Sequence, residues 1–300
     1  MALLPVIGWI GAGRMGVPMA GSLLRAGYPV VVYSRSATKR RKLVSQGARE
    51  ATSVAECTRA AEVLFSSLPD DRALREVALG PEGLLANAKA GAVFADTSTV
   101  SPELSEEVSR DAEQRGVAYL RIPISGNAAS AQLGELTALV SGPEPAWRIV
   151  KPMVETFSRT QIYLGAGEEA RHMKLVINLL VVATAQAMAE ALALGRKAGL
   201  GWQALLDTIG QSTIASPFLK VKAGLMKQRD FTPTMTTHLI LKDIDLMLAA
   251  ARAHGVQMPV TSATRQVMQG AVDAGFGEAD YMMIIQLAEQ QCGLSSEEMD

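Results

Sequence analysis

The chain has 300 residues, of which 48% are hydrophobic and 20% charged, a length typical of about two domains. Its 29 basic and 30 acidic residues nearly cancel, so we expect neither a nucleic acid nor a membrane surface as partner. Two cysteines exclude a disulfide framework and a cysteine-built metal site, and the three histidines lack the spacing of zinc ligands.

The first half of the chain alternates short β-branched runs with helical patterns. Strands are predicted at 6–10, 30–33, 63–67, 92–95, 118–122 and 137–140, with helices at about 15–26 and 39–46 after the first two. This alternation indicates βαβ units and a parallel sheet, and therefore an α/β fold.

The second half of the chain contains only helical patterns. Helices are predicted at 168–198, 202–209, 236–254, 260–274 and 279–291. We therefore expect an α/β domain over residues 1–165 and an all-α domain over 166–300. The longest apolar stretch, 175–189, is interrupted by Asn178, Thr184 and Gln186, so we expect no membrane segment and a cytoplasmic protein.

A glycine-rich motif, G-x-G-x-x-G, follows the first predicted strand and opens the first helix. It comprises Gly11, Ala12, Gly13, Arg14, Met15 and Gly16. In that position it predicts dinucleotide binding: the first glycine permits a tight turn, the second admits a pyrophosphate, and the third lets the helix approach the sheet. The free N–H groups of the helix start would face the phosphates. A glycine turn without a ligand is the alternative, and Arg14 fits a phosphate contact or a solvated position equally well.

The end of the second predicted strand favours NADP over NAD. An NAD enzyme usually carries Asp or Glu there, whereas this chain reads Ser34, Arg35 and Ser36. Arg35 can pair with a 2′-phosphate and stack on the adenine, and both serines can donate hydrogen bonds. NAD remains possible, because the basic run at 39–42 is also explained as a solvated helix start.

Several further motifs follow in order along nearly the whole chain. They are Ser67-Leu68-Pro69, Asp96 to Pro102, Pro123-Ile124-Ser125-Gly126, Gly165-x-Gly167 through Lys174 and Asn178, and Lys242-Asp243. With the glycine motif, they make the chain resemble the β-hydroxyacid dehydrogenase family. That family includes 3-hydroxyisobutyrate dehydrogenase, tartronate semialdehyde reductase and glyoxylate/succinic semialdehyde reductase, and is related to 6-phosphogluconate dehydrogenase.

The resemblance implies a Rossmann-like N-terminal domain, a long interdomain helix, and a helical domain that forms homodimers or homotetramers. It assigns the nicotinamide end of the cofactor site to Leu68, Pro69 and Thr99, together with Lys242. It assigns a substrate carboxylate to Ser125, Gly126 and the amide of Asn127. Lys174 would be the catalytic acid/base, Asn178 would orient the substrate, and Lys242 with Asp243 would close the site.

The residue pattern around Lys174 is compatible with that role. Lys174 and Asn178 are four residues apart, so they share one face of a helix. Beside the apolar residues Met173, Leu175 and Val176 the ammonium group can be partly desolvated, and desolvation lowers its pKa, which suits proton transfer. His172 points roughly 200° away around the helix and is not expected to share the site. A surface lysine that extends to solvent is the alternative.

Three positions depart from the family pattern. Arg121 replaces the acid of the usual Asp-Ala-Pro-Val-Ser-Gly-Gly segment, which reverses the charge near the substrate side. Asn127 replaces its last glycine and still offers an N–H group, and Ile177 replaces an asparagine next to Asn178. We expect an NADP-dependent reductase of a small aldehyde or keto acid. An imine reductase on the same scaffold and a non-catalytic cofactor-binding scaffold are the alternatives, and retention of Lys174 argues against both.

Overall fold

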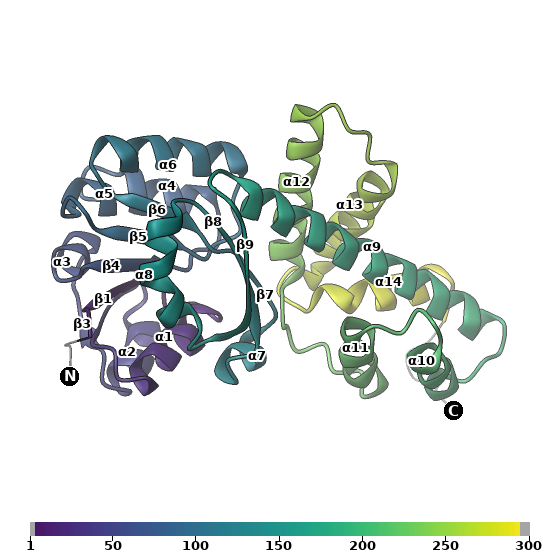
Figure 1. Cartoon of the computed structure of the whole chain (residues 1–300). Helices are drawn as coiled ribbons and strands as arrows, with labels where there is room; N and C mark the ends of the chain where they lie inside the picture. The colour runs from purple at the N-terminus through teal and green to yellow at the C-terminus, as the bar shows by residue number, and fades with distance from the viewer. Residues whose placement is uncertain (1–3, 295–300) are drawn as a thin grey trace. The chain divides into compact units, whose positions relative to one another are not determined.

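The structure is a computed structural model that describes residues 4–294. Its contacts divide the chain into two compact units, 1–175 and 176–300, and helix α9 (Glu169–Lys197) continues from one unit into the next (Figure 1). The sequence placed the boundary at 165. The unit boundary comes later because Ala170, Arg171 and Leu175, in the first two turns of α9, are buried with the sheet unit.

The first unit is built on a nine-stranded sheet in the order β3-β2-β1-β4-β5-β6-β8-β7, with β9 paired to β8. The strands are β1 (Ile7–Ile10), β2 (Val30–Tyr33), β3 (Arg49–Glu50), β4 (Val63–Ser66), β5 (Val93–Asp96), β6 (Ala118–Arg121), β7 (Ile124–Ser125), β8 (Leu136–Ser141) and β9 (Ser158–Gly165). Strands β1 to β6 run parallel, as expected.

The prediction of a parallel strand at 137–140 is wrong in direction. Strand β8 pairs antiparallel with β6 and β7, and parallel with β9. The connection from β7 to β8 is the five-residue helix α7 (Ala128–Gln132), which is too short for the crossover that a parallel pair needs. The sequence also missed β3, β7 and β9, because the first two have two residues each and β9 is mostly exposed.

Helices cover both faces of the sheet. One face carries α1 (Gly16–Arg25), α2 (Ala37–Val44), α7 and α8 (Glu144–Val154), and the other carries α3 (Val54–Arg59), α4 (Asp71–Leu79), α5 (Leu84–Asn87) and α6 (Pro102–Gln114). Successive strand residues alternate between the two cores: Phe65 packs with α1 and α8, whereas its neighbour Leu64 packs with α4 and α6. Strands buried on both faces explain the continuous apolar runs in the sequence.

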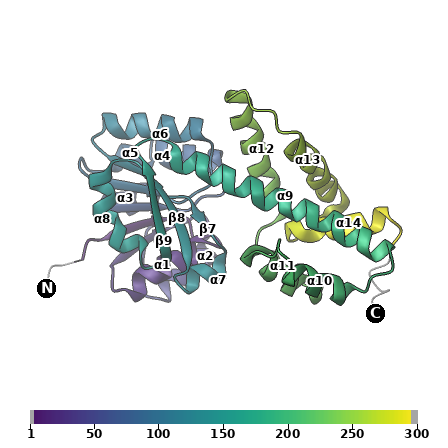
Figure 2. The same ribbon diagram turned by 45° about the vertical axis from the view of Figure 1, so that its right-hand side comes forward.

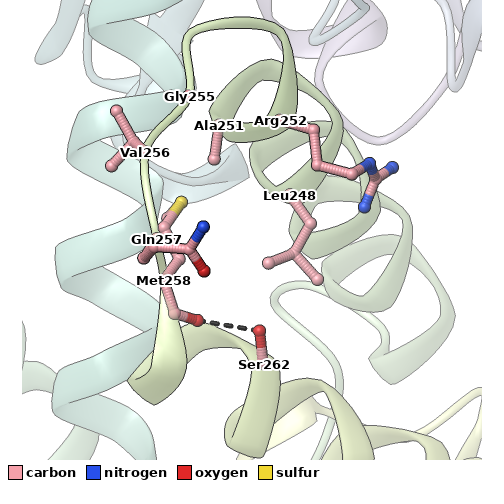
Figure 3. A pocket seen from close by; sticks show the side chains of 8 residues that line it. All are labelled: Leu248, Ala251, Arg252, Gly255, Val256, Gln257, Met258 and Ser262. Carbon is pink, nitrogen blue, oxygen red and sulfur yellow. Dashed lines mark hydrogen bonds between the residues drawn. The ribbon is translucent and has the colours of Figure 1, made fainter.

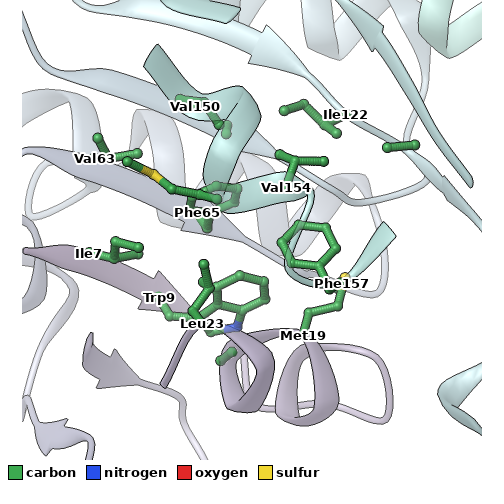
Figure 4. Packing of buried hydrophobic residues seen from close by; sticks show 14 of the residues in the cluster. Ile7, Trp9, Met19, Leu23, Val63, Phe65, Ile122, Val150, Val154 and Phe157 are labelled. Carbon is green, nitrogen blue, oxygen red and sulfur yellow. The ribbon is translucent and has the colours of Figure 1, made fainter. Parts of the chain in front are cut away.

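An aromatic cluster of Trp9, Phe65 and Phe157 lies in the core that Figure 4 shows. The Trp9 ring stacks on Phe65 at 5.4 Å between centroids, and Phe157 meets Trp9 edge-on at 6.4 Å. The indole N–H of Trp9 donates to the carbonyl of Gly11 at 2.9 Å. This buried ring therefore fixes the backbone where the glycine motif begins.

The second unit contains the rest of α9 and five further α-helices among the described residues. These are α10 (Trp202–Gln211), α11 (Pro217–Lys227), α12 (Thr237–Ala253), α13 (Pro259–Ala271) and α14 (Ile284–Gln291), with a π-turn at Val272–Phe276 and a 3-10 turn at Tyr281–Met283. Helix α12 packs on α13, and α10 on α11 (Figures 1 and 2). The sequence missed α11, which Ser216 caps and Pro217 opens.

Helix α9 is long and apolar enough to cross a membrane by length and composition, although no membrane segment was expected from the sequence. Such a helix is weak evidence of a membrane span, because the core helix of a globular domain passes the same test. Here its polar residue Asn178 is buried and hydrogen-bonded to Asp243 on α12. Asn178 is therefore satisfied by protein contacts.

Candidate active site

The strand ends of the first unit gather most of the predicted cofactor residues at one edge of the sheet. The register pairs Ile10 with Tyr33 and with Ser66, Ser66 with Asp96, and Asp96 with Arg121. Because these strands are parallel neighbours, the loops that follow them leave the sheet at the same edge. Strand β1 lies between β2 and β4, where the strand order reverses, and this is the place where open α/β sheets bind ligands.

The glycine motif has the shape that the sequence predicts. Gly11 has φ of +105°, and a Cβ there would lie 2.3 Å from the Ser67 carbonyl oxygen. At Gly16 a Cβ would lie 2.0 Å from the Gly11 carbonyl oxygen. A Cβ on Gly13 would meet no atom within 4 Å, so this position faces open space. No side chain caps the start of α1. An open backbone cradle in front of an uncapped helix start fits a pyrophosphate.

The loop after β2 is held by a residue that the sequence did not single out. Arg40 donates to the Ser34 carbonyl, and its Nε lies 2.6 Å from Glu50 Oε1 on β3. Ser36 caps α2, because its Oγ accepts from the Lys39 amide at 3.4 Å. Arg35 is exposed at the turn. Arg35 is therefore the exposed arginine of this loop, while Arg40 stabilises the loop.

The loops after β4 and β5 are linked by hydrogen bonds through Asp96, which is fully buried. Asp96 Oδ1 accepts from Ser66 Oγ and from Ser98 Oγ, both at 2.5 Å. Ser98 Oγ in turn accepts from the Leu68 amide at 2.9 Å. The predicted nicotinamide residues Leu68, exposed Pro69 and half-buried Thr99 therefore lie on two loops that are tied together.

The predicted carboxylate loop follows β7. Ser125 is half-buried, and Gly126 has φ of +130° with its hypothetical Cβ 2.6 Å from Leu136, so a larger residue would be strained there. Asn127 is extended and caps α7, because its Oδ1 accepts from the Ser130 amide at 3.0 Å. The replacement of glycine by asparagine is thus explained by helix capping, and the Asn127 amide remains the atom proposed for substrate.

The residues predicted to do chemistry belong to both units. Lys174 is half-buried on α9, and Asn178 follows one turn later, as expected. Of the three apolar neighbours expected to desolvate Lys174, only Leu175 is buried, whereas Met173 and Val176 are exposed. Partial desolvation of the half-buried Lys174 therefore stays a prediction.

Asn178 belongs to a buried polar group in the helical unit. Its Nδ2 donates to Asp243 Oδ2 at 2.8 Å, and Lys242 Nζ lies 2.8 Å from Asp243 Oδ1. Asp243 is only 1% exposed. The carboxylate therefore orients the amide of Asn178 by a hydrogen bond and lies within ion-pair distance of the Lys242 ammonium group.

Comparisons with known proteins agree with this geometry. Residues 6–165 match the family described as the NAD binding domain of 6-phosphogluconate dehydrogenase. Residues 165–288 match the family described as the NAD-binding of NADP-dependent 3-hydroxyisobutyrate dehydrogenase. The chain belongs to the β-hydroxyacid dehydrogenase family. It is an NAD(P)-dependent oxidoreductase acting on CH–OH groups.

Named relatives cover nearly the whole chain. The 2-(hydroxymethyl)glutarate dehydrogenase of Eubacterium barkeri is 31% identical over 290 residues, which is 96% of this chain and 96% of the relative. Glyoxylate/succinic semialdehyde reductase 2 of Arabidopsis thaliana is 29% identical over 93% of this chain and 78% of its own. The structure of Mycobacterium tuberculosis 3-hydroxyisobutyrate dehydrogenase with L-serine has a TM-score of 0.85 at 27% identity, covering 95% of this chain and 99% of that one.

An imine reductase from a Pseudomonas species shares the fold, with a TM-score of 0.63 over 94% of this chain and 99% of that one. Its sequence is 22% identical, so the likeness concerns the fold alone.

Arg121, the main departure of this β-hydroxyacid dehydrogenase from its family pattern, is not an unpaired cation. Its guanidinium group is buried, donates through Nε to Glu168 Oε1 at 2.8 Å, and stacks over the Tyr119 ring at 4.7 Å. The charge reversal expected near the substrate is therefore neutralised by Glu168, the residue just before α9. The substitution creates a contact to the start of this helix.

Sequence reasoning missed a second arginine. Arg171, three residues before Lys174, is 1% exposed, and its Nη2 lies 2.5 Å from Asp96 Oδ2. It was not among the site residues predicted from the sequence. A charged residue on the buried face of an apolar helix was the available signal. Among residues 4–294, no group of three or more His, Cys, Asp or Glu side chains is arranged to hold a metal ion.

A surface pocket of about 360 Å³ lies in the helical unit, between the end of α12 and the start of α13 (Figure 3). Its lining residues are Leu248, Ala251, Arg252, Gly255, Val256, Gln257, Met258 and Ser262. Ser262 Oγ donates to the Met258 carbonyl at 2.8 Å, which is an ordinary first-turn contact. None of the predicted site residues lines this pocket.

Proposed function

We propose that this enzyme uses NADPH to reduce a small aldehyde or keto acid, and that the hydroxy acid is the substrate of the reverse reaction. The observation that carries the proposal is the succession of Lys174 and Asn178 on one face of α9, with Asn178 fixed by buried Asp243. A proton donor and an orienting amide one turn apart can reach the two sides of one carbonyl group.

Lys174 is proposed to donate a proton from its ammonium group to the carbonyl oxygen of the substrate. The nicotinamide, when bound, supplies the hydride to the carbonyl carbon. In the oxidative direction Lys174 accepts the hydroxyl proton. The N–H groups of Gly126 and Asn127, with the Ser125 hydroxyl, would bind the substrate carboxylate. These donors carry no charge, so they would bind the carboxylate without placing a second cation beside the Lys174 ammonium group.

A preference for NADP is supported by the loop after β2. Arg35 is exposed there, and Arg40 stabilises the loop by donating to the Ser34 carbonyl. The carboxylate of Glu50, on the neighbouring strand, is paired with Arg40. An arginine at this position with the nearby acid neutralised suits a 2′-phosphate.

We also propose that the protein is a cytoplasmic homodimer or homotetramer that associates through the helical unit and binds neither nucleic acid nor membrane. Support comes from Val176, Leu180 and Leu194 on α9, which are 54%, 61% and 73% exposed. From Met173 through these three residues, the successive spacings are three, four and fourteen residues. Such spacings place all four side chains on one face of α9, as on the contact face of paired helices. Sedimentation of the wild type and of Leu180→Asp tests this proposal, which a monomeric wild type contradicts.

The test of the activity is NADPH and NADH oxidation with glyoxylate, succinic semialdehyde, tartronate semialdehyde, methylmalonate semialdehyde and a cyclic imine. We expect an aldehyde acid to be reduced, and Lys174→Ala to lower kcat by at least 100-fold while NADPH binding persists. Turnover of the imine alone would make the chain an imine reductase. Tight NADPH binding without any turnover would favour a cofactor-binding scaffold.

A further inference from the structure

A buried carboxylate at the end of β5 collects contacts from three parts of the sheet unit. Asp96 is 0% exposed, and its Oδ1 accepts from the side chains of Ser66 and Ser98 and from the Ser98 amide at 3.2 Å. Its second oxygen, Oδ2, accepts from Arg171 Nη2 at 2.5 Å. Both oxygens are thus satisfied, as an ionised group without access to water requires.

Arg171 completes this network from the first turn of α9. Besides Asp96, its guanidinium group donates to the Ser98 carbonyl at 2.5 Å, to Tyr119 Oη at 2.9 Å and to Ser105 Oγ at 3.2 Å. Burial opposes its charge, but Tyr119 and Asp96 more than compensate, so the pKa of Arg171 is raised above its ordinary value. One planar cation therefore joins α9 to β5, β6 and α6.

Contacts with two further side chains, Arg121 and Ser141, hold the segment that enters α9. Glu168 is paired with Arg121 at the end of β6. Ser141 Oγ donates to the Gly167 carbonyl at 2.7 Å and accepts from the Ala170 amide at 3.2 Å. These contacts fix where the helix begins. Arg171 then fixes the rotation of the helix about its axis, because the planar guanidinium group has hydrogen-bond partners in several directions.

We propose that Arg171 is a positioning residue for catalysis, which sets the direction in which Lys174 presents its ammonium group. The two residues are three apart, so their side chains lie roughly 60° apart and one turn apart along α9. Any rotation of the helix about Arg171 moves Lys174 by the same angle. The inference rests on the proposed function, because it assigns Arg171 a role only through Lys174.

The choice of arginine supports this role over simple charge neutralisation. A lysine would satisfy Asp96 with a single cationic centre, but it lacks the fixed fork that reaches Ser98, Tyr119 and Ser105 simultaneously. Arg171→Lys therefore keeps the charge and loses the geometry. A matched control is Arg75→Lys: Arg75 makes a two-bond pair with Glu107 at 2.5 and 2.6 Å, but this pair is exposed on the same unit.

The first measurement compares steady-state kinetics of the wild type, Arg171→Lys and Arg75→Lys. We expect Arg171→Lys to lower kcat at least tenfold with the KM for NADPH within threefold, and Arg75→Lys to change neither. The same substitution is then made in Lys174→Ala. If Arg171 acts through Lys174, Arg171→Lys lowers kcat less than twofold when Lys174 is already alanine. An unchanged kcat, or an equal loss with and without Lys174, overturns the proposal, because a merely structural role gives that result.

Amide hydrogen exchange separates this inference from the proposed function. Arg171→Lys should speed exchange across residues 170–175 at least tenfold, whereas Arg75→Lys should not. If the wild type reduces no substrate, the proposed function fails, and unchanged exchange then overturns the positioning role as well. If Arg171→Lys does not fold, the double variant Arg171→Met with Asp96→Asn removes both buried charges, and the same kinetic and exchange criteria apply to it.

Discussion

Gly13→Ala tests whether Gly13 is needed for ligand binding rather than for the stability of the fold. The alanine Cβ would meet no atom within 4 Å, and Gly13 does not have a φ in the left-handed region. The folded protein should therefore accept it. Because alanine restricts the unfolded chain, we expect the free energy of unfolding to rise by about 0.4–1 kcal/mol.

The same methyl group would stand where a pyrophosphate must approach the backbone. A hydrogen bond to a charged group contributes about 1.5–3 kcal/mol, so displacing a phosphate from one or two amides should cost about 3 kcal/mol. That corresponds to a roughly 100-fold higher Kd for NADPH. Calorimetric titration with NADPH, and urea unfolding without it, measure the two quantities on the same preparation.

Gly16→Ala is the control with the opposite pattern. Its Cβ would lie 2.0 Å from the Gly11 carbonyl oxygen, so the loop must move even without ligand. We expect about 1–3 kcal/mol of destabilisation, as for other overpacked sites. The reasoning is refuted if Gly13→Ala binds NADPH within twofold of the wild type, or if it destabilises the ligand-free protein as much as Gly16→Ala does.

Three other predictions concern the cofactor site and the core. Arg35→Asp should weaken NADPH binding at least tenfold more than NADH binding, and equal effects in a fluorescence titration would remove Arg35 from the 2′-phosphate site. Trp9→Phe removes the hydrogen bond from the indole N–H to the Gly11 carbonyl, so urea unfolding should show a loss of about 1–3 kcal/mol. Burial raises the pKa of Cys57 from 9.0 to about 12, so the unfolded state loses its thiol proton first and stability falls between pH 9 and 12. From pH 8 to 10 the loss should be about 1.4 kcal/mol, and Cys57→Ala should lack this part of the decline.

The sequence predicted the parts of the molecule that rest on local patterns. Alternation of strands and helices gave β1, β2, β4, β5 and β6, and the spacing of the glycines gave the turn that Gly11 and Gly16 form. These features depend on neighbours along the chain. The direction of β8 depends instead on the connection through α7, whose five residues are too few for the crossover of a parallel pair.

Individual side-chain partners were harder to predict because they come from distant positions. Arg121 suggested a reversed charge, but its acid, Glu168, is 47 residues later in the chain. Asn127 departed from the glycine of the family pattern, and its side chain caps the next helix. In both cases the residue type was noted correctly and its partner was not, since pairing across the sheet leaves no periodic trace in one sequence.

Helix α9 illustrates how such pairs complement apolar packing. Its buried face contains small residues such as Ala185 and Ala189, and apolar contact alone is non-directional, so it fixes the rotation of a helix poorly. Arg171, Asn178 and Arg196 lie within roughly 20° of each other around the helix, at 3.6 residues per turn.

Each of these three donors has a buried acidic acceptor: Asp96 for Arg171, Asp243 for Asn178, and Glu289 for Arg196. A slip of one residue along the helix would turn all three donors away by roughly 100° and remove one donor from each of these buried carboxylates. The polar pairs therefore fix the rotation of the apolar helix, and with it the direction of Lys174.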